Sequence, residues 1–351
     1  MMSVAWLGLG ISLSLAVAGA EPDSKSAVTR VEDADADFAV QGEYTGPVWW
    51  QGRYQHVGLQ IVALGDGKFD ALAYPGGLPG NGYNGGTKTK LSGARTDTGV
   101  ALSSEGVQIA WQPGLAVTVA DGCGRAIGYL QRLNRYSSTT GALPPANAKV
   151  LFNGTDTGLF KNAKISDAGL LQIGAETVDP VRDFTLHAEF KTPYMPYARS
   201  QARGNSGFYL QKRYEVQVLD SFGLEPAVNE AASLYKFKAP DMNMSFPPLS
   251  WQTYDIHFTA ARFDAEGKRT AKARITVRHN GVVVQNNLEL DNKTGGGSQE
   301  GPNPLPILLQ NHGNPIEFRN IWLVDHAASP ATCPCPQQYV ARQPVRWFKR
   351  R

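Results

Sequence analysis

The chain has 351 residues, of which 42% are hydrophobic and 19% charged, so it is long enough for two globular domains. Its formal net charge is only +3, from 34 Lys and Arg against 31 Asp and Glu, and this balance argues against a nucleic-acid partner. The 37 Gly and 22 Pro indicate many turns, and therefore short strands rather than long helices.

The N-terminus has the pattern of an export signal. Residues 4–17 are almost wholly apolar or small, and Ala18-Gly19-Ala20 supplies the small residues of a signal peptidase site. The apolar run is shorter than the ~20 residues that span a bilayer. We therefore predict a cleaved signal peptide over residues 1–20, a flexible acidic leader over 21–36, and a periplasmic or extracellular protein without stable membrane insertion.

Residues 37–136 are expected to form an N-terminal β domain. Short apolar or alternating stretches are separated by turn clusters rich in Gly, Asp and Pro, such as residues 65–67 and 75–77. Residues 137–147 combine Ser, Thr, Pro and Ala and are predicted to be a linker. An odd number of cysteines, three, excludes a fully paired disulfide framework in an exported chain.

Residues 148–326 are expected to form a second all-β domain. About nine strand-like stretches, spaced by Pro and Gly, favour a two-sheet sandwich of the jelly-roll type. The best helix candidate is residues 229–235. The remaining residues, 327–351, are predicted to be a flexible tail.

Residues 203–221 carry the densest set of polar side chains and are expected to form a β-hairpin. In its second strand, alternation places Glu215 and Gln217 on the face opposite Val216 and Val218. One bulge after these residues would bring Asp220 to the same polar face. The result would be a row of Glu, Gln and Asp along one surface of a curved sheet.

A polar row of this kind suits a sugar, whose hydroxyl groups need paired donors and acceptors. The residues expected to contact sugar hydroxyls are Arg203, Asn205, Gln211 and Gln217. Those expected to stack on a sugar ring are Tyr209, Tyr235 and Trp251. The alternative is that the row is simply the solvent-exposed face of an antiparallel strand.

His312 follows a strand in the run Gln310-Asn-His-Gly-Asn-Pro315. Gly313 and Pro315 fix a tight turn, which would present the imidazole at a sheet edge. His312 could equally be an ordinary surface residue. Other histidines, at positions 187, 257 and 279, lie inside apolar strands and are expected to be structural.

Several ordered blocks of the second domain resemble a known family. The blocks cover residues 150–154, 183–190, 203–207, 214–221, 251–255, 279–282 and 312–322. Together they resemble the 3-keto-disaccharide hydrolase domain, also described as a 3-keto-glucoside-1,2-lyase and 3-keto-2-hydroxy-glucal hydratase domain. The resemblance covers residues 148–326 and implies a concanavalin A-like jelly roll. It also implies a carbohydrate substrate, a 3-keto-glycoside.

The resemblance implies base-initiated chemistry. A ketone at C3 acidifies the hydrogen at C2, a base removes it, the aglycone leaves C1 by β-elimination, and water adds to the resulting enone. On that reasoning His312 and Glu215 are the leading candidates for base or metal ligand, and Asp220 is next. Gln217, Arg203 and Asn205 would position hydroxyls or stabilise the oxyanion. A divalent metal ion held by Glu215 and His312 is the one cofactor that this chemistry suggests.

Two other functions remain open from the sequence. Glu215-x-Gln217-x-x-Asp220 has the spacing of the acidic strand of laminarinase-like glycosidases, which share the jelly-roll fold. Direct retaining hydrolysis needs two carboxyl groups ~5–5.5 Å apart, and here a glutamine replaces the central acid. The third possibility is a non-catalytic carbohydrate-binding protein, because this fold does not decide function.

Overall fold

Short alternating segments separated by glycine turns form strands throughout residues 27–326, the part of the chain that the computed structural model describes. The all-β prediction is confirmed: three 3-10 turns are the only helical elements in residues 27–326, η1 (Val31–Asp33), η2 (Ala36–Ala39) and η3 (Ser200–Ala202). No helix in this range is long and apolar enough to cross a membrane. The predicted signal peptide, residues 21–26 and the tail from 327 lie outside the described residues.

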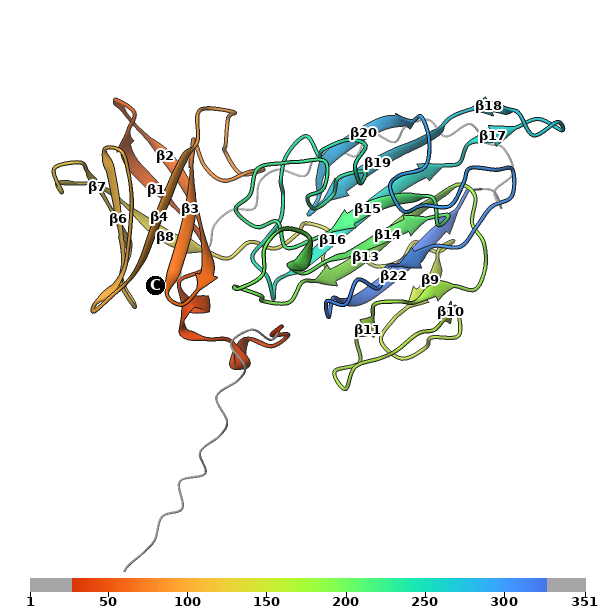
Figure 1. The fold of residues 1–351 in the computed structure, drawn as a ribbon, viewed down its shortest axis with the longest axis horizontal. Coiled ribbons are helices and arrows are strands. Elements are labelled where there is room, and N and C mark those ends of the chain that lie inside the picture. The colour runs from red at the N-terminus through yellow and green to blue at the C-terminus, as the bar shows by residue number, and fades with distance from the viewer. Residues whose placement is uncertain (1–26, 327–351) are drawn as a thin grey trace, which may run out of the picture.

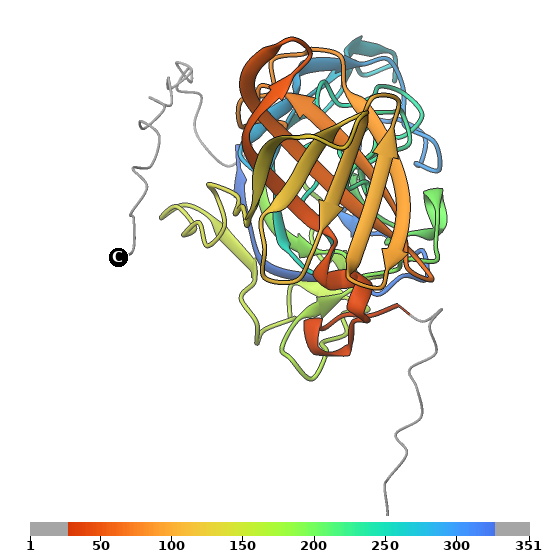
Figure 2. The ribbon, with the colours of Figure 1, turned by 90° about the vertical axis from the view of Figure 1, so that its left-hand side faces the viewer.

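The N-terminal domain is a closed antiparallel barrel (Figures 1 and 2). Each strand pairs with the next, and the first pairs with the last. The strands are β1 (Gly42–Trp50), β2 (Arg53–Gly65), β3 (Lys68–Pro75), β4 (Thr89–Thr96), β5 (Gly99–Ser104), β6 (Val107–Trp111), β7 (Val117–Asp121) and β8 (Ala126–Leu133). Closure leaves no free sheet edge, and apolar side chains such as Leu59, Ile61 and Val119 fill the interior.

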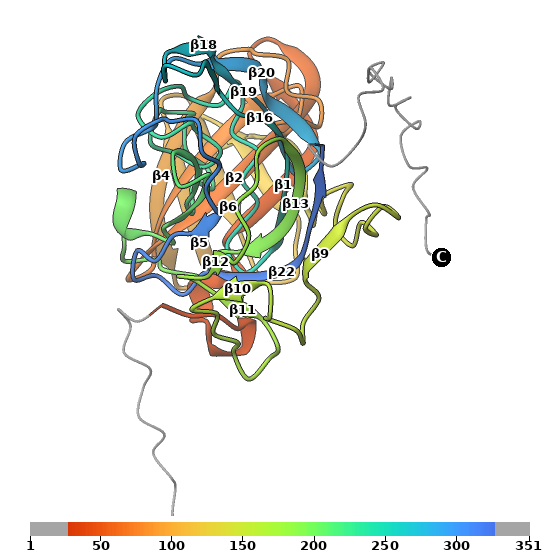
Figure 3. The ribbon, with the colours of Figure 1, turned by 90° about the vertical axis from the view of Figure 1, so that its right-hand side faces the viewer.

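The second domain contains two larger sheets (Figures 1 and 3). The five-stranded sheet has the order β10 (Phe160–Lys161), β12 (Glu176–Thr177), β21 (Leu308–Leu309), β14 (Ser206–Leu210), β15 (Tyr214–Val218). The seven-stranded sheet has the order β11 (Leu171–Gln172), β22 (Glu317–Asp325), β13 (Phe184–Lys191), β16 (Trp251–Thr259), β19 (Ala273–His279), β20 (Val282–Leu290), and β9 (Lys149–Phe152) also pairs with β22. Strands β17 (Arg262–Phe263) and β18 (Arg269–Ala271) form a separate hairpin.

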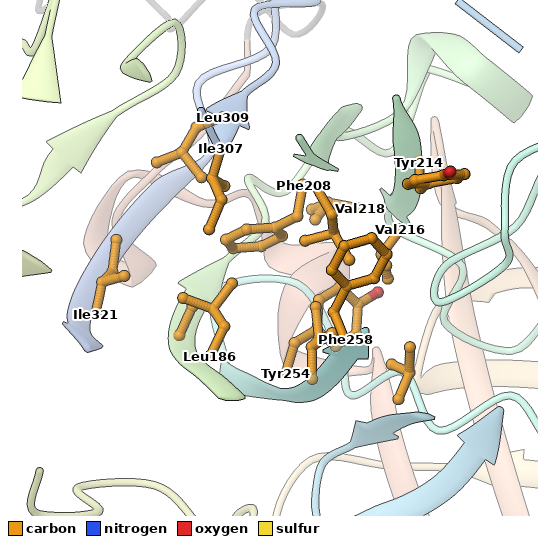
Figure 4. Close-up of a cluster of buried hydrophobic side chains, with 14 of the residues drawn as sticks. Leu186, Phe208, Tyr214, Val216, Val218, Tyr254, Phe258, Ile307, Leu309 and Ile321 are labelled. Atoms are coloured by element: carbon orange, nitrogen blue, oxygen red, sulfur yellow. The ribbon is translucent and has the colours of Figure 1, made fainter. Parts of the chain in front are cut away.

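The two sheets share one hydrophobic core (Figure 4). Phe208 of the five-stranded sheet is fully buried, and its ring makes edge contacts with Tyr254 and Phe318 of the other sheet at centroid distances of 5.9 and 5.5 Å. A sandwich of this kind removes one face of each sheet from water. The side chains available for binding must therefore lie on the outer faces, where loops cover them, or at the ends of the strands.

Part of the predicted linker is fastened to the outer face of the seven-stranded sheet. The Thr139 hydroxyl donates to Asp255 Oδ2 at 2.8 Å, and the Gly141 N–H donates to Glu189 Oε1 at 2.5 Å. Beneath it, His187 is fully buried and bonds Asp255 Oδ1 through Nδ1 at 2.6 Å. Burial opposes its charged form, but hydrogen bonds to Asp255 and Glu189 outweigh burial and raise the pKa of His187 to about 9.

The barrel and the sandwich are joined by specific contacts. Tyr194 belongs to the sandwich domain, yet its ring is buried with the barrel core, and its hydroxyl donates to Asp35 at 2.9 Å. Val28, in the predicted leader, exchanges backbone hydrogen bonds with Tyr194 at 3.0 and 2.8 Å. Arg199 Nη2 donates to the carbonyl oxygen of Leu64 on β2 at 2.9 Å. These contacts place the barrel beside the open end of the β14–β15 hairpin.

Candidate functional site

The β14–β15 hairpin carries the predicted polar row. In its register, Phe208 pairs with Val216 on the core face, whereas Tyr209 pairs with Glu215 and Gly207 pairs with Gln217. Because neighbours on a strand point to opposite faces, Glu215 and Gln217 lie together on the outer face of the five-stranded sheet, as their alternation predicts.

Glu215 is buried although it lies on the outer face. The residue is only 2% exposed, and within residues 27–326 its carboxyl accepts one hydrogen bond, from the Tyr209 hydroxyl to Oε2 at 2.7 Å. Burial raises the pKa of Glu215 to about 7, and the bond from Tyr209 opposes this rise. The row is therefore not the solvent-exposed face of a strand.

Two segments cover this face. Residues 229–235, expected to be helical, instead form turns along the outer edge of β15, where the N–H of Ala232 donates to Gln217 O at 2.9 Å and that of Tyr235 to Glu215 O at 3.2 Å. The backbone groups at that strand edge need partners, and supplying them outweighs local helical propensity. The second segment is residues 295–296: a Cβ on Gly295 would lie 2.7 Å from the Tyr235 ring, and one on Gly296 would lie 3.1 Å from the Tyr209 hydroxyl.

Gln217 is the second member of the row and is 1% exposed. Its Nε2 donates to Gln201 Oε1 and to Asn205 Oδ1, both at 3.1 Å. Its Oε1 is buried and has no hydrogen-bond partner within residues 27–326, and the same holds for Oε1 of Gln310. Buried acceptors without partners are uncommon, and a sugar hydroxyl is a donor that would satisfy them.

The loop that carries His312 lies at the neighbouring strand. β21 pairs with β14, and beyond it the Gln310 N–H donates to Gly207 O at 2.9 Å. Asn314 Oδ1 accepts the N–H of Asn205 at 2.7 Å. The loop is thus anchored at one end to β14 and at the other to Asn205, just before β14, and His312 lies exposed between the anchors.

Asp220 and Arg203 form a separate pair beyond the end of the strand. The register between β14 and β15 is unbroken and β15 ends at Val218, so the bulge that would return Asp220 to the polar face is absent. Asp220 Oδ2 instead accepts Arg203 Nε at 2.7 Å. An unpaired arginine buried at this strand end would be costly, and pairing with it accounts for the position of Asp220.

Two predicted sugar-binding residues lie away from the row. Gln211 occupies the hairpin turn with φ of 49°, and its Nε2 donates to Val181 O at 2.7 Å, which makes it a structural residue. Trp251 begins β16 in the other sheet, where the Arg319 guanidinium lies 3.9 Å from its ring centroid. Alternation shows which residues share a face of a strand, but not which sheet the strand joins.

The sequence prediction missed three residues of the site: Gln201, Gln310 and Asn314. The last two flank His312 in a polar run that offered a signal. Gln201 offered none, because it lies in η3 and reaches Gln217 only through the fold.

A metal centre of the common type does not fit the described side chains. Within residues 27–326, no group of three or more His, Cys, Asp or Glu side chains is arranged to hold a metal ion. The close side-chain partner of Glu215 is a tyrosine. No step below is therefore derived through a metal, and metal dependence remains a prediction.

The raised pKa of Glu215 predicts a pH-dependent cost to folding. A carboxyl with a higher pKa in the folded state makes stability fall as the pH rises from its unfolded pKa, about 4.5, to about 7. Glu215→Gln should remove this fall. The gain in unfolding free energy of the variant over the wild type should therefore be larger at pH 8 than at pH 4, by at most about 3 kcal/mol. Urea unfolding at both pH values measures it. The exposed Glu105→Gln serves as control, and equal behaviour of both variants would contradict the burial argument.

Two crystal structures from Parabacteroides distasonis ATCC 8503, each described as a "putative glycosyl hydrolase", are similar to this chain. The first is 34% identical, covers 52% of this chain and 84% of its own, and has a TM-score of 0.47. The second is 18% identical, covers 51% of this chain and 94% of its own, and has a TM-score of 0.38.

No curated protein matches the chain. Residues 147–324, about half of the sequence and nearly all of the sandwich, match the model of a single domain family. The chain therefore belongs to the family of 3-keto-alpha-glucoside-1,2-lyase-like domains, as its sequence blocks predict.

Proposed function

We propose that this protein is an exported enzyme, periplasmic or extracellular, that cleaves 3-keto-glucosides with Glu215 as the general base. The observation that carries the proposal is a buried carboxyl with no cationic partner among the described residues, whose pKa lies near 7. A base works best when its pKa is close to the working pH. Family membership supports a carbohydrate substrate and the cleavage of a glycosidic bond.

The reaction starts at C2 of the oxidised sugar ring. Glu215 takes the C2 hydrogen as a proton, and the electron pair of the broken bond forms an enolate with the C3 ketone. The enolate then re-forms the ketone and a C1=C2 double bond forms. The bond from C1 to the aglycone oxygen breaks, its electron pair stays with that oxygen, and the oxygen takes up the proton held by Glu215, either directly or through solvent. Water adds at C1 and a proton returns to C2, so the net change is hydrolysis.

The neighbouring residues would hold the ring and the base. Tyr209 fixes the Glu215 carboxyl through its hydroxyl at 2.7 Å. The free Oε1 atoms of Gln217 and Gln310 would accept hydrogen bonds from sugar hydroxyls. His312, exposed on the anchored loop beside Asn205, would contact the substrate.

A direct retaining glycosidase fits less well. It requires two carboxyl groups about 5–5.5 Å apart. Asp220, the second acid of the laminarinase-like spacing, lies past the end of β15 and is engaged by Arg203. The site therefore offers one base beside the ring rather than a pair of acids.

The first test compares a 3-keto-glucoside with its unoxidised parent. Turnover of the keto sugar alone is expected, because only the ketone acidifies C2. Product formation is measured with and without EDTA, which also reports any metal dependence. Turnover of the parent sugar would contradict the elimination mechanism, and binding of the keto sugar without turnover would indicate a carbohydrate-binding protein.

The second test uses the pH dependence of kcat/KM. Activity should rise with pH through about 7, where Glu215 becomes ionised. The hydrogen bond from Tyr209 lowers this pKa, so Tyr209→Phe should move the rise to higher pH. Glu215→Gln should reduce kcat by roughly 10²–10⁴-fold, while Glu105→Gln should not. An unshifted profile in Tyr209→Phe would exclude Glu215 as the titrating base.

The third test concerns His312. His312→Ala should lower kcat/KM at least about tenfold if the imidazole contacts the reacting ring, a loss of about 1.4 kcal/mol of transition-state stabilisation. The matched control is His326→Ala, an exposed histidine at the end of the other sheet. Equal activity of the two variants would show that His312 is an ordinary surface residue with no part in the reaction.

A further inference from the structure

A cleft of about 640 Å³ opens between the barrel and the end of the β14–β15 hairpin. This volume lies within the range of small-molecule binding sites, which often form between domains. The barrel wall includes Asp70, Ser92 and Ser103, which are cross-strand neighbours on β3, β4 and β5. Arg203 and Asp220 belong to the opposite wall. The cleft is therefore built from both domains.

Arg203 supplies an unused donor in the sandwich wall. The residue is 5% exposed, its Nε donates to Asp220 Oδ2 at 2.7 Å, and its Nη2 is buried with no hydrogen-bond partner within residues 27–326. A buried guanidinium nitrogen without an acceptor costs free energy. A hydroxyl oxygen of a ligand beside Asp220 would satisfy it, and the Asp220 carboxylate would accept a hydrogen bond from a neighbouring hydroxyl.

The cleft is next to the proposed catalytic row but is not part of it. Ser200 lines the cleft, and the next residue, Gln201, accepts the hydrogen bond from Gln217. Asp220 lies five positions after Glu215, which corresponds to at most about 17 Å of extended chain at ~3.3 Å per residue. That length exceeds one sugar ring, so a ligand that reached both points would contain several rings.

We propose that this cleft binds the sugar units of an oligosaccharide beyond the ring that Glu215 attacks. The assignment rests on the proposed function and specifies its substrate class as oligosaccharides rather than simple glucosides. Serine hydroxyls and charged groups on the two walls match sugar hydroxyls, while Leu224, which is 40% exposed, offers apolar contact to a sugar ring. The barrel would thus form one wall of the substrate site.

The two walls are held at a fixed spacing by contacts that flank the cleft. Arg199, itself in the lining, donates to Leu64 O of the barrel at 2.9 Å. Lys88 of the barrel forms an ion pair with Glu225 of the sandwich. Preorganised walls reduce the entropy lost when a flexible ligand binds.

The test is a binding measurement with unoxidised sugars, which does not depend on turnover. Calorimetric titration compares maltotetraose and cellotetraose with the corresponding methyl glucosides. We expect at least one tetrasaccharide to bind the wild-type protein tenfold or more tightly than its methyl glucoside. Ser92→Trp, which fills the cleft from an exposed barrel position, should abolish that difference. Ala110→Trp, an exposed barrel position outside the cleft, should leave it unchanged.

Equal binding of tetrasaccharides and methyl glucosides by the wild-type protein would overturn the proposal, as would an unchanged preference in Ser92→Trp. Failure of the proposed catalytic function gives a different result. In that case the 3-keto-glucoside is not turned over, while the tetrasaccharide preference and its loss in Ser92→Trp persist. If the catalytic proposal and the cleft proposal are both correct, Ser92→Trp should raise the KM for a 3-keto-oligosaccharide at least tenfold. The KM for a 3-keto methyl glucoside should then change by less than twofold.

Discussion

The pleat of β15 is the constraint on which the site depends. Val216 and Val218 are fully buried in the core shared by the two sheets, so Glu215 and Gln217 must face the other way. A shift of one residue would place a carboxyl in an aromatic core and expose the valines. The position of the proposed base is therefore set by hydrophobic packing on the opposite face of the strand.

Burial alone does not give Glu215 its character, as a comparison with Glu189 makes clear. The two side chains are almost equally buried, at 2% and 1% exposed. Burial also disfavours the ionised form of Glu189 and so raises its pKa. Hydrogen bonds from His187, Asn320, the linker and Arg319 outweigh burial and bring the pKa of Glu189 down to about 2. Among the described residues, only the Tyr209 hydroxyl donates a hydrogen bond to the Glu215 carboxyl, and the pKa of Glu215 lies near 7. The first carboxylate fastens a linker, whereas the second remains available as a base.

The sequence predicted much of this arrangement because its signals were local. Alternation identified the face on which Glu215 and Gln217 lie. Gly313 indicated the turn that carries His312, and its φ of 84° is one that glycine adopts readily. The closure of the N-terminal strands into a barrel was not predicted, because local patterns do not show which strand pairs with the last. The same limit separated Trp251 from the row, since its sheet is chosen by packing between distant segments.

The surroundings of Glu215 also bear on which sugar chemistry the site can perform. Cleaving an unactivated glycoside requires an acid at the leaving oxygen together with a second carboxyl, and the nearest acid along the strand, Asp220, is already engaged by Arg203. A lone base is sufficient only when the substrate brings its own acidity, which a C3 ketone supplies at C2. On the proposed mechanism, an oxidation at C3 must therefore precede this enzyme, and the protein needs no strong acid because that earlier step has activated the bond.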